Sequence, residues 1–132
     1  MPRLKVFIRS PQQRHKLLRF TTVGRKKPIT RHAAVIIEAK YLELLRRGYE
    51  VTVGRTGDKE IDFVCDKRGE KLYVQVCYLL ASDETVNREF GAYDSIRDNF
   101  PKYVVSLDEF DMSRNGIKHR NIRDFLLAEE WN

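Results

Sequence analysis

Apolar and polar positions predict a helix followed by three strands from about residue 30 onward. Residues 31–47 place apolar side chains at helical spacing, Thr30 fits the N-cap, and Gly48 follows the last turn. Segments rich in β-branched and aromatic residues then predict three strands, at residues 50–54, 60–66 and 70–80. The pair Arg68-Gly69 fits a two-residue turn between the second and third strands, which would make them a hairpin.

The second half of the chain predicts a helix over residues 82–100 that ends at Pro101. A strand, a short extended piece and a last helix capped by Asn121 follow, at residues 102–108, 117–120 and 121–131. Because a helix separates the third and fourth strands, we expect a parallel crossover. The predicted fold is therefore α/β (α+β), with a mixed four-stranded sheet flanked by helices. With 132 residues, we expect one domain over 31–132, preceded by a poorly defined arm over 1–30.

Two polar residues interrupt the apolar pattern of the predicted hairpin. Asp62 lies between Ile61 and Phe63 on one strand, and Gln75 lies between Val74 and Val76 on the next. With a turn at Arg68-Gly69, Asp62 faces Gln75, with Cβ atoms roughly 5 Å apart. Glu60 and Cys77 form the next pair on the same face, since side-chain direction repeats every two residues. This register also keeps Cys65 opposite Leu72, so the two cysteines are not expected to form a disulfide.

Glu38 presents a third oxygen-bearing side chain, in the middle of the apolar face predicted for the first helix. That face is formed by Ala34, Val35, Ile37, Tyr41, Leu42, Leu44 and Leu45. Glu43 instead falls on the polar side with Arg46 and Arg47. A buried carboxylate costs several kcal/mol unless it is paired or holds a cation. Glu38, Asp62 and Gln75 could together hold Mg²⁺, which prefers a few oxygen ligands completed by water. The alternative is that Asp62 and Gln75 only form structural hydrogen bonds.

Composition narrows the classes of protein that fit. A hydrophobic content of 42% and a charged content of 33% are typical of globular proteins, and no apolar run approaches the ~18 residues that span a bilayer. Two cysteines and the scattered His15, His32 and His119 show no zinc spacing. With no secretory signal and no expected disulfide, a cytoplasmic location is predicted.

The net charge of +6 is unevenly distributed. Residues 1–37 contain ten Lys or Arg and no Asp or Glu, whereas the remaining 95 residues are mildly acidic. Such an arm suits nucleic-acid phosphates, with Arg25, Lys26, Lys27 and Arg31 as the candidate contacts. A solvated tail or an organellar transit peptide explains the same composition.

The segments EIDFV, YVQV and NGIKHRNIRDFL carry a specific resemblance in combination. Roughly residues 30–127 resemble a C-terminal domain of unknown function that follows the ATPase module in prokaryotic AAA-type ATPases. That domain is similar to the restriction-endonuclease-like, or PD-(D/E)XK, fold, with an αβββαβ core. The resemblance implies DNA and an AAA-type ATPase module as partners. No membrane partner is expected, because no apolar run is long enough to span a bilayer.

The resemblance also assigns roles at the predicted hairpin. It places Asp62 at the motif Asp, Gln75 at the Glu/Gln and Glu38 at the helix carboxylate, and it puts Cys77 where the catalytic lysine stands. A thiol cannot orient the attacking water or stabilise the charge on a phosphate as lysine does. Glu60 and Glu89 are accessory candidates, and Lys59, Lys71 or Arg88 could replace the missing lysine.

Three functions follow from these expectations. The first is a catalytically degenerate nuclease-like domain that binds nucleic acid or another protein. The second is an active Mg²⁺-dependent DNA endonuclease, and the third is a structural remnant that docks on an ATPase partner. The chain has no GxxxxGK[ST] motif, so no ATP binding through a P-loop is expected.

Overall fold

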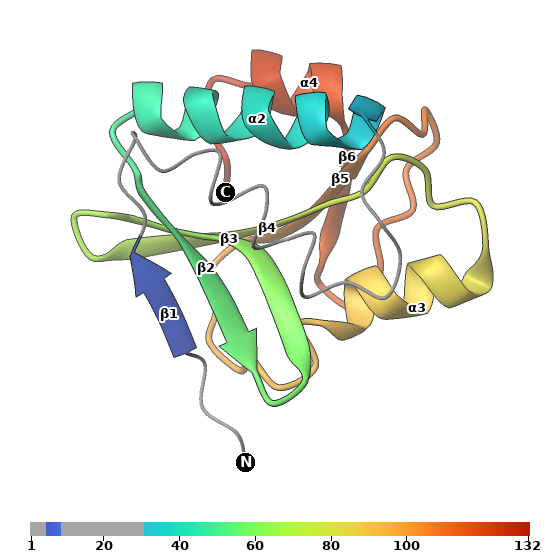
Figure 1. Ribbon diagram of the computed structural model, residues 1–132, viewed down its shortest axis with the longest axis horizontal. Helices are drawn as coiled ribbons and strands as arrows, with labels where there is room; N and C mark the ends of the chain where they lie inside the picture. Colours follow the sequence, from blue (N-terminus) through green and yellow to red (C-terminus); the bar gives the residue numbers. More distant parts are fainter. Residues whose placement is uncertain (1–4, 9–30) are drawn as a thin grey trace.

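The computed structural model describes residues 5–8 and 31–132, which form one mixed sheet flanked by helices (Figure 1). The sheet order is β1-β2-β3-β4-β5-β6. The strands are β1 (Lys5–Ile8), β2 (Glu50–Thr56), β3 (Lys59–Lys67), β4 (Glu70–Val76), β5 (Lys102–Ser106) and β6 (Lys118–Asn121). The α+β class predicted from the sequence is thereby confirmed.

Strand direction changes once across the sheet. Strands β1 to β4 pair antiparallel, and β4, β5 and β6 pair parallel, which confirms the crossover expected after the third strand. The four predicted strands are β2 to β5, and the extended piece at residues 117–120 is β6. Residues 5–8 fall in the predicted arm, yet as β1 they extend the sheet beside β2.

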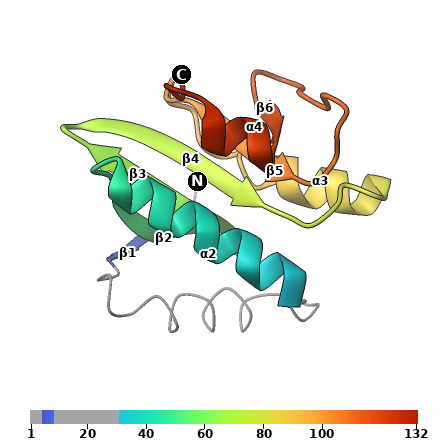
Figure 2. The ribbon, with the colours of Figure 1, turned by 90° about the horizontal axis from the view of Figure 1, so that it is seen from above.

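In the described part of the chain, three helices cover the two faces of the sheet: α2 (Arg31–Arg46), α3 (Asp83–Gly91) and α4 (Ile122–Leu127). Helices α2 and α4 lie on one face and α3 lies on the other, as Figures 1 and 2 show. The first core contains Tyr41 and Leu44 of α2 and Phe125 of α4. The second contains Val86 and Phe90 of α3, so each face buries a separate apolar layer against the same sheet.

Helix α3 is shorter than the sequence predicts. Ser82 caps its N-terminus, accepting a hydrogen bond from Thr85 N–H, but the helix ends at Gly91 rather than at Phe100. The carbonyl of Gly91 accepts a hydrogen bond from Lys59 Nζ at 2.9 Å. A side chain of β3 thus supplies a donor to a carbonyl that has no partner within the helix. The following Tyr93 donates its hydroxyl to the carbonyl of Tyr103, which fixes the segment on the sheet instead of in a helix. Helix α4 likewise ends early, at Leu127.

The β3–β4 turn confirms the predicted hairpin. Arg68 and Gly69 both have positive φ values, of 55° and 82°, as the favoured two-residue hairpin turn requires. Cys65 pairs with Leu72, and both cysteines are free and buried. The register thus sets Asp62 and Gln75 opposite each other just beyond the last paired residues, Phe63 and Val74.

Candidate functional site

Asp62 lies in a β-bulge of strand β3. On the neighbouring strand β2, Thr52 pairs with Val64 and Gly54 pairs with Ile61, so two residues of β3 lie opposite the single residue between them. Those two residues are Asp62 and Phe63. A bulge of this kind bends the strand and redirects a side chain, and bulges are common next to functional sites.

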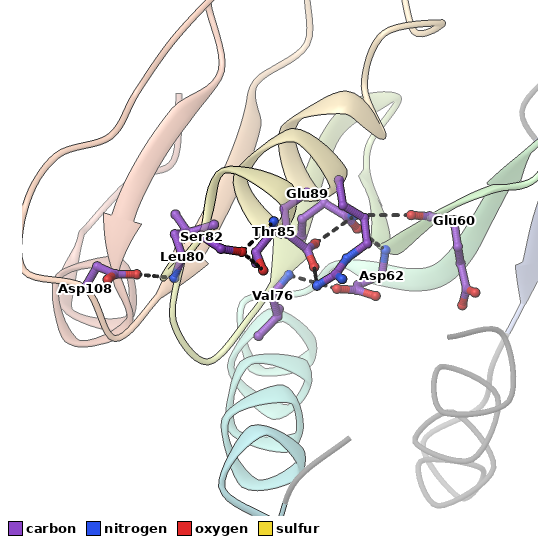
Figure 3. Close-up of polar contacts among 10 residues, drawn as sticks. Glu60, Asp62, Val76, Leu80, Ser82, Thr85, Glu89 and Asp108 are labelled. Carbon is purple, nitrogen blue, oxygen red and sulfur yellow. Dashed lines mark hydrogen bonds and ion pairs between the residues drawn. The ribbon is translucent and has the colours of Figure 1, made fainter. Parts of the chain in front are cut away.

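Asp62 and Gln75 join β3 to β4 through their side chains where the backbone pairing ends (Figure 3). The backbone N–H of Asp62 donates to Gln75 Oε1 at 2.6 Å, and the backbone N–H of Val76 donates to Asp62 Oδ2 at 2.8 Å. At its other end, the Gln75 amide donates from Nε2 to the carbonyl of Glu60 at 3.1 Å. Both side chains therefore satisfy backbone groups that the sheet leaves unpaired.

Helix α3 closes the site with a buried carboxylate. Glu89 is 2% exposed, and its Oε2 lies 3.4 Å from Gln75 Nε2 while its Oε1 lies 3.4 Å from an Arg88 guanidinium nitrogen. The sequence analysis names Glu89 as an accessory candidate, and the structure places its carboxylate directly against Gln75 of β4. Glu60 contributes its carbonyl, whereas its carboxylate points away from the cluster (Figure 3), 3.8 Å from an Arg55 nitrogen.

Water has little access to this cluster. Asp62 is 1% exposed and Gln75 is 4% exposed, which are values typical of a core rather than a cleft. Cys77, at the position that the resemblance assigns to the catalytic lysine, is also buried. Burial and the nearby carboxylates of Glu89 and Asp108 raise the pKa of the Cys77 thiol, so it stays neutral at physiological pH.

Lys40 is a member of this neighbourhood that the sequence analysis missed. Its side chain is fully buried, its ammonium lies 5.0 Å from the centre of the Phe125 ring, and no hydrogen-bond acceptor meets it within the described part of the chain. Burial lowers the pKa of Lys40 well below its usual value, and electrostatic interactions with Cys77 and Asp62 only partly oppose that shift. An amine of α2 therefore lies in this neighbourhood, whereas the resemblance would place the lysine on β4.

The predicted buried face of α2 is displaced by about one helix position. Lys40, Tyr41 and Leu44 form the buried line, whereas Leu42, expected on the apolar face, is 43% exposed. Glu38, expected at the centre of that face, is half-buried. The spacing of Lys40 with Leu44 at i, i+4 was the available signal, but a lysine is rarely fully buried and was not counted with the apolar residues.

The structure places the three cations proposed as substitutes for the missing lysine in different parts of the fold. Arg88 reaches the cluster through Glu89. Lys59 binds the carbonyl of Gly91 and lies 3.3 Å from Asp94, at the C-terminal end of α3. Lys71 pairs with Asp66 near the turn of the hairpin, four residues along β3 and β4 from the Asp62–Gln75 pair. Lys59 and Lys71 are therefore engaged or placed elsewhere.

A second polar network joins the ends of β5 and β6. His119 Nδ1 accepts from the backbone N–H of Met112 at 3.2 Å, so the neutral ring carries its proton on Nε2 and donates to Ser106 Oγ at 2.8 Å. Ser106 in turn donates to Asp108 Oδ2 at 2.7 Å, which also accepts from the backbone N–H of Leu80. Serine donates to the aspartate here and accepts from the histidine, so the order does not suit a nucleophilic serine.

The candidate nucleic-acid contacts cannot be placed in the same way. Arg25, Lys26 and Lys27 lie outside the described residues, and Arg31 begins α2 without a described side chain. Within the described residues, no group of three His, Cys, Asp or Glu side chains is arranged to hold a metal ion. None of the described helices is long and apolar enough to cross a membrane.

Comparison with known proteins gives one relative of undetermined function. An uncharacterized protein of Haemophilus influenzae is 36% identical to the chain over 88 residues. The aligned part is 66% of this chain but 21% of the relative, so the chain spans about a fifth of the relative's length. No family model matches the chain, and no solved structure matches it.

Proposed function

We propose that the chain is a cytoplasmic nuclease-like domain that has lost hydrolytic activity and acts as a nucleic-acid-binding module. The observation that carries the loss of activity is the use of Asp62 and Gln75 as links between β3 and β4. Asp62 Oδ2 accepts the Val76 N–H, and the Gln75 amide is engaged at both ends. Side chains committed in this way are poorly available as metal ligands.

The donor set also fits a divalent cation poorly. Gln75 is a neutral ligand, and its oxygen already accepts a 2.6 Å hydrogen bond from Asp62 N–H. Burial of Asp62 and Gln75 to 4% exposure or less leaves a phosphodiester no route to them. These features support a structural rather than a catalytic role for the cluster.

Nucleic-acid binding is supported by the distribution of charge. Ten Lys or Arg and no acidic residues fall within residues 1–37. Binding driven by phosphate neutralisation weakens with salt, with a slope of about −0.9 in log–log form for each phosphate contacted in duplex DNA. The chain should therefore bind DNA of unrelated sequences with a steep salt dependence.

The test is fluorescence anisotropy of a labelled duplex at several salt concentrations. The unmodified chain is compared with a triple variant, Arg25→Gln, Lys26→Gln and Lys27→Gln, which keeps the chain length. The proposal expects the variant to bind more weakly and to show a slope shallower by about two to three units. A flat salt response, or no binding by the unmodified chain, would remove nucleic acid from the proposal.

An active Mg²⁺-dependent DNA endonuclease is a second candidate, and Lys40 is the observation that favours it. Lys40 supplies, from α2, an amine near Asp62 that Cys77 does not supply from β4. In this reading Asp62 and Glu38 would hold the ion, and Lys40 would orient the water or stabilise the phosphate. It expects metal-dependent cleavage that both Asp62→Asn and Lys40→Met abolish, with titration calorimetry showing Mn²⁺ bound to the unmodified chain.

Docking on an ATPase partner is the third candidate. Leu79 and Phe110 are 42% and 83% exposed, on loops that meet where the Leu80 N–H donates to Asp108. The chain also spans 21% of its Haemophilus influenzae relative, which leaves room for another module in that protein. Co-purification with an AAA-type ATPase that Phe110→Ser disrupts would support docking, and unchanged co-purification would argue against this surface.

A further inference from the structure

A groove opens on the α3 face of the sheet, separate from the Asp62–Gln75 cluster. Its volume is about 790 Å³, within the range of ligand-binding clefts. It is lined by the last turn of α3, by the segment over residues 93–100 and by the turn that precedes β6. Phe90, Phe100 and Ile117 supply its apolar surface.

The two acidic residues of the groove are already engaged. Asp98 accepts the Tyr73 hydroxyl at 2.6 Å and the Lys102 ammonium at 2.9 Å. Burial opposes ionisation of Asp98, but these bonds and one from the Phe100 N–H outweigh it, so the pKa of Asp98 is lowered and the group is an anion. Asp94 lies 3.3 Å from Lys59 Nζ. Neither carboxylate is available to neutralise a further cation.

The lysine of the groove is likewise committed. Lys102 Nζ donates to the carbonyl and carboxylate of Asp98 and to the carbonyl of Phe100, which occupies all three of its protons. These bonds hold the loop that carries Asn99. Lys102 therefore shapes the groove and has no donor left for a ligand.

Two guanidinium groups remain, those of Arg97 and Arg114. Both residues are exposed and line the groove, and in the described structure no carboxylate lies within salt-bridge distance of either. Arg114 lies 5.1 Å above the Phe90 ring, a contact that orients the guanidinium without cancelling its charge. The exposed amides of Asn87, Asn99 and Asn115 line the same groove.

Arg114 is held on a rigid support. Its N–H donates to the carbonyl of Ile117 at 3.0 Å, and the Ile117 N–H donates back at 2.8 Å, which closes a two-residue turn. Asn115 and Gly116 have φ values of 53° and 78°, as that turn requires. A fixed backbone lowers the entropy lost when a side chain on it binds a ligand.

We propose that this groove binds the sugar–phosphate backbone of a nucleic-acid strand, with Arg97 and Arg114 on the phosphates. Guanidinium groups match phosphate oxygens in a two-bond geometry, and asparagine amides commonly contact phosphate and sugar. The half-buried ring of Phe100 lines the groove and offers an apolar contact for a base, as aromatic side chains do in single-strand binders. The inference rests on the proposed nucleic-acid binding and adds a second contact surface to the basic residues 1–37.

The test compares two double variants of the full chain. Arg97→Gln with Arg114→Gln removes the groove cations, and Arg68→Gln with Arg123→Gln removes two exposed cations on the hairpin turn and on α4 as a matched control. Anisotropy of a labelled oligothymidylate is measured against salt, and the fluorescence of Trp131 confirms that each variant is folded. Unlabelled oligothymidylate and polyglutamate of equal charge serve as competitors.

The groove variant should bind at least tenfold more weakly at low salt, with a slope shallower by about 1.4 units, because two phosphate contacts to a single strand are lost. The control variant should change affinity by less than threefold. Equal losses in both variants, or displacement by polyglutamate as effective as by the oligonucleotide, would overturn the groove as a nucleic-acid site. No binding by the unmodified chain would overturn the proposed function together with the groove.

Discussion

Asp62 and Gln75 hold β3 and β4 together by a reciprocal arrangement of side chain and backbone. Gln75 Oε1 accepts the Asp62 N–H at 2.6 Å, and Asp62 Oδ2 accepts the N–H of Val76, the residue after Gln75, at 2.8 Å. The regular pairing of the two strands ends at Phe63 and Val74, so the side chains continue the connection where the backbone ladder stops. A pair that resembles the metal-binding half of a nuclease motif is thus part of the sheet's own hydrogen bonding.

Replacing Gln75 by Leu should destabilise the chain strongly. The change leaves the Asp62 N–H and the Glu60 carbonyl without their partner in a buried environment, at a cost of about 2–4 kcal/mol in the free energy of unfolding. Urea denaturation followed by Trp131 fluorescence measures it. Gln75→Glu is the matched variant. Its new carboxylate would be repelled by Glu89, so its loss of stability relative to the unmodified chain should be smaller at acidic pH than at neutral pH. A loss below about 0.5 kcal/mol for Gln75→Leu would contradict the structural role.

Replacing Lys40 by Met should stabilise the chain at neutral pH. Methionine fills a similar volume and removes a buried amine that has no hydrogen-bond partner among the described residues, a gain of about 1–3 kcal/mol. Lys40→Ala is the control, because it removes the amine but leaves a cavity and should not stabilise.

The same variant has a defined pH dependence. Burial lowers the pKa of Lys40, so between that lowered value and about 10.4 the unfolded chain binds the proton and the folded chain does not. The stability of the unmodified chain therefore rises with pH across this window, and the advantage of Lys40→Met should shrink as the pH approaches 10. An advantage that stays constant with pH would show that Lys40 remains protonated in the fold.

Acidification should destabilise the chain through His119. Burial lowers the pKa of His119 below its usual 6.5, and the carboxylates of Asp108 and Asp111 only partly oppose this shift. The unfolded chain then binds the proton first, so stability falls as the pH drops below about 6.5 and through the lowered folded pKa. Protonation also replaces the acceptor at Nδ1 by a donor that faces the Met112 N–H.

Thermal denaturation between neutral pH and pH 5 measures this effect. His119→Asn retains an acceptor and a donor but cannot titrate, so its melting temperature should depend less on pH than that of the unmodified chain. Parallel pH profiles for the two proteins would show that His119 is not the group responsible.

Arg47 should anchor the C-terminal segment to α2. Its guanidinium lies 3.9 Å from the Trp131 ring and donates to the carbonyls of Leu126 and Glu129. Arg47→Ala should cost about 1–3 kcal/mol and shift Trp131 emission to longer wavelength, as the ring gains contact with water. Arg47→Lys keeps the charge but loses the forked geometry, so it should recover only part of the stability. Unchanged Trp131 emission in Arg47→Ala would show that Arg47 does not hold the C-terminal segment against α2.

The hairpin was predictable because its turn chemistry is local. Arg68-Gly69 forms a two-residue turn, and counting residue pairs back from that turn places Asp62 opposite Gln75. The bulge at Asp62 was not predictable in the same way, because an extra residue in β3 leaves no signal in the alternation of that strand alone. It becomes visible only in the pairing with β2.

Helix α2 shows where helical periodicity fails. The apolar residues predicted a buried face centred near Glu38, but the structure buries Lys40 together with Tyr41 and Leu44. Packing against Phe125 decides how α2 is rotated on the sheet. Phe125 lies on α4, far from α2 in the sequence, so the local apolar pattern of α2 carries no signal of this contact. The short α3 has a similar cause, since its end is set by Lys59 of β3 and by Tyr93 bonding to Tyr103.

The most direct test of the central claim is the cleavage of DNA by the unmodified chain and by Asp62→Asn in the presence of Mn²⁺. The account predicts that both proteins leave plasmid and linear DNA equally intact, while Asp62→Asn lowers the free energy of unfolding because its link to Val76 is weakened. Metal-dependent cleavage by the unmodified chain that Asp62→Asn abolishes would contradict it, and would make Asp62 a catalytic residue.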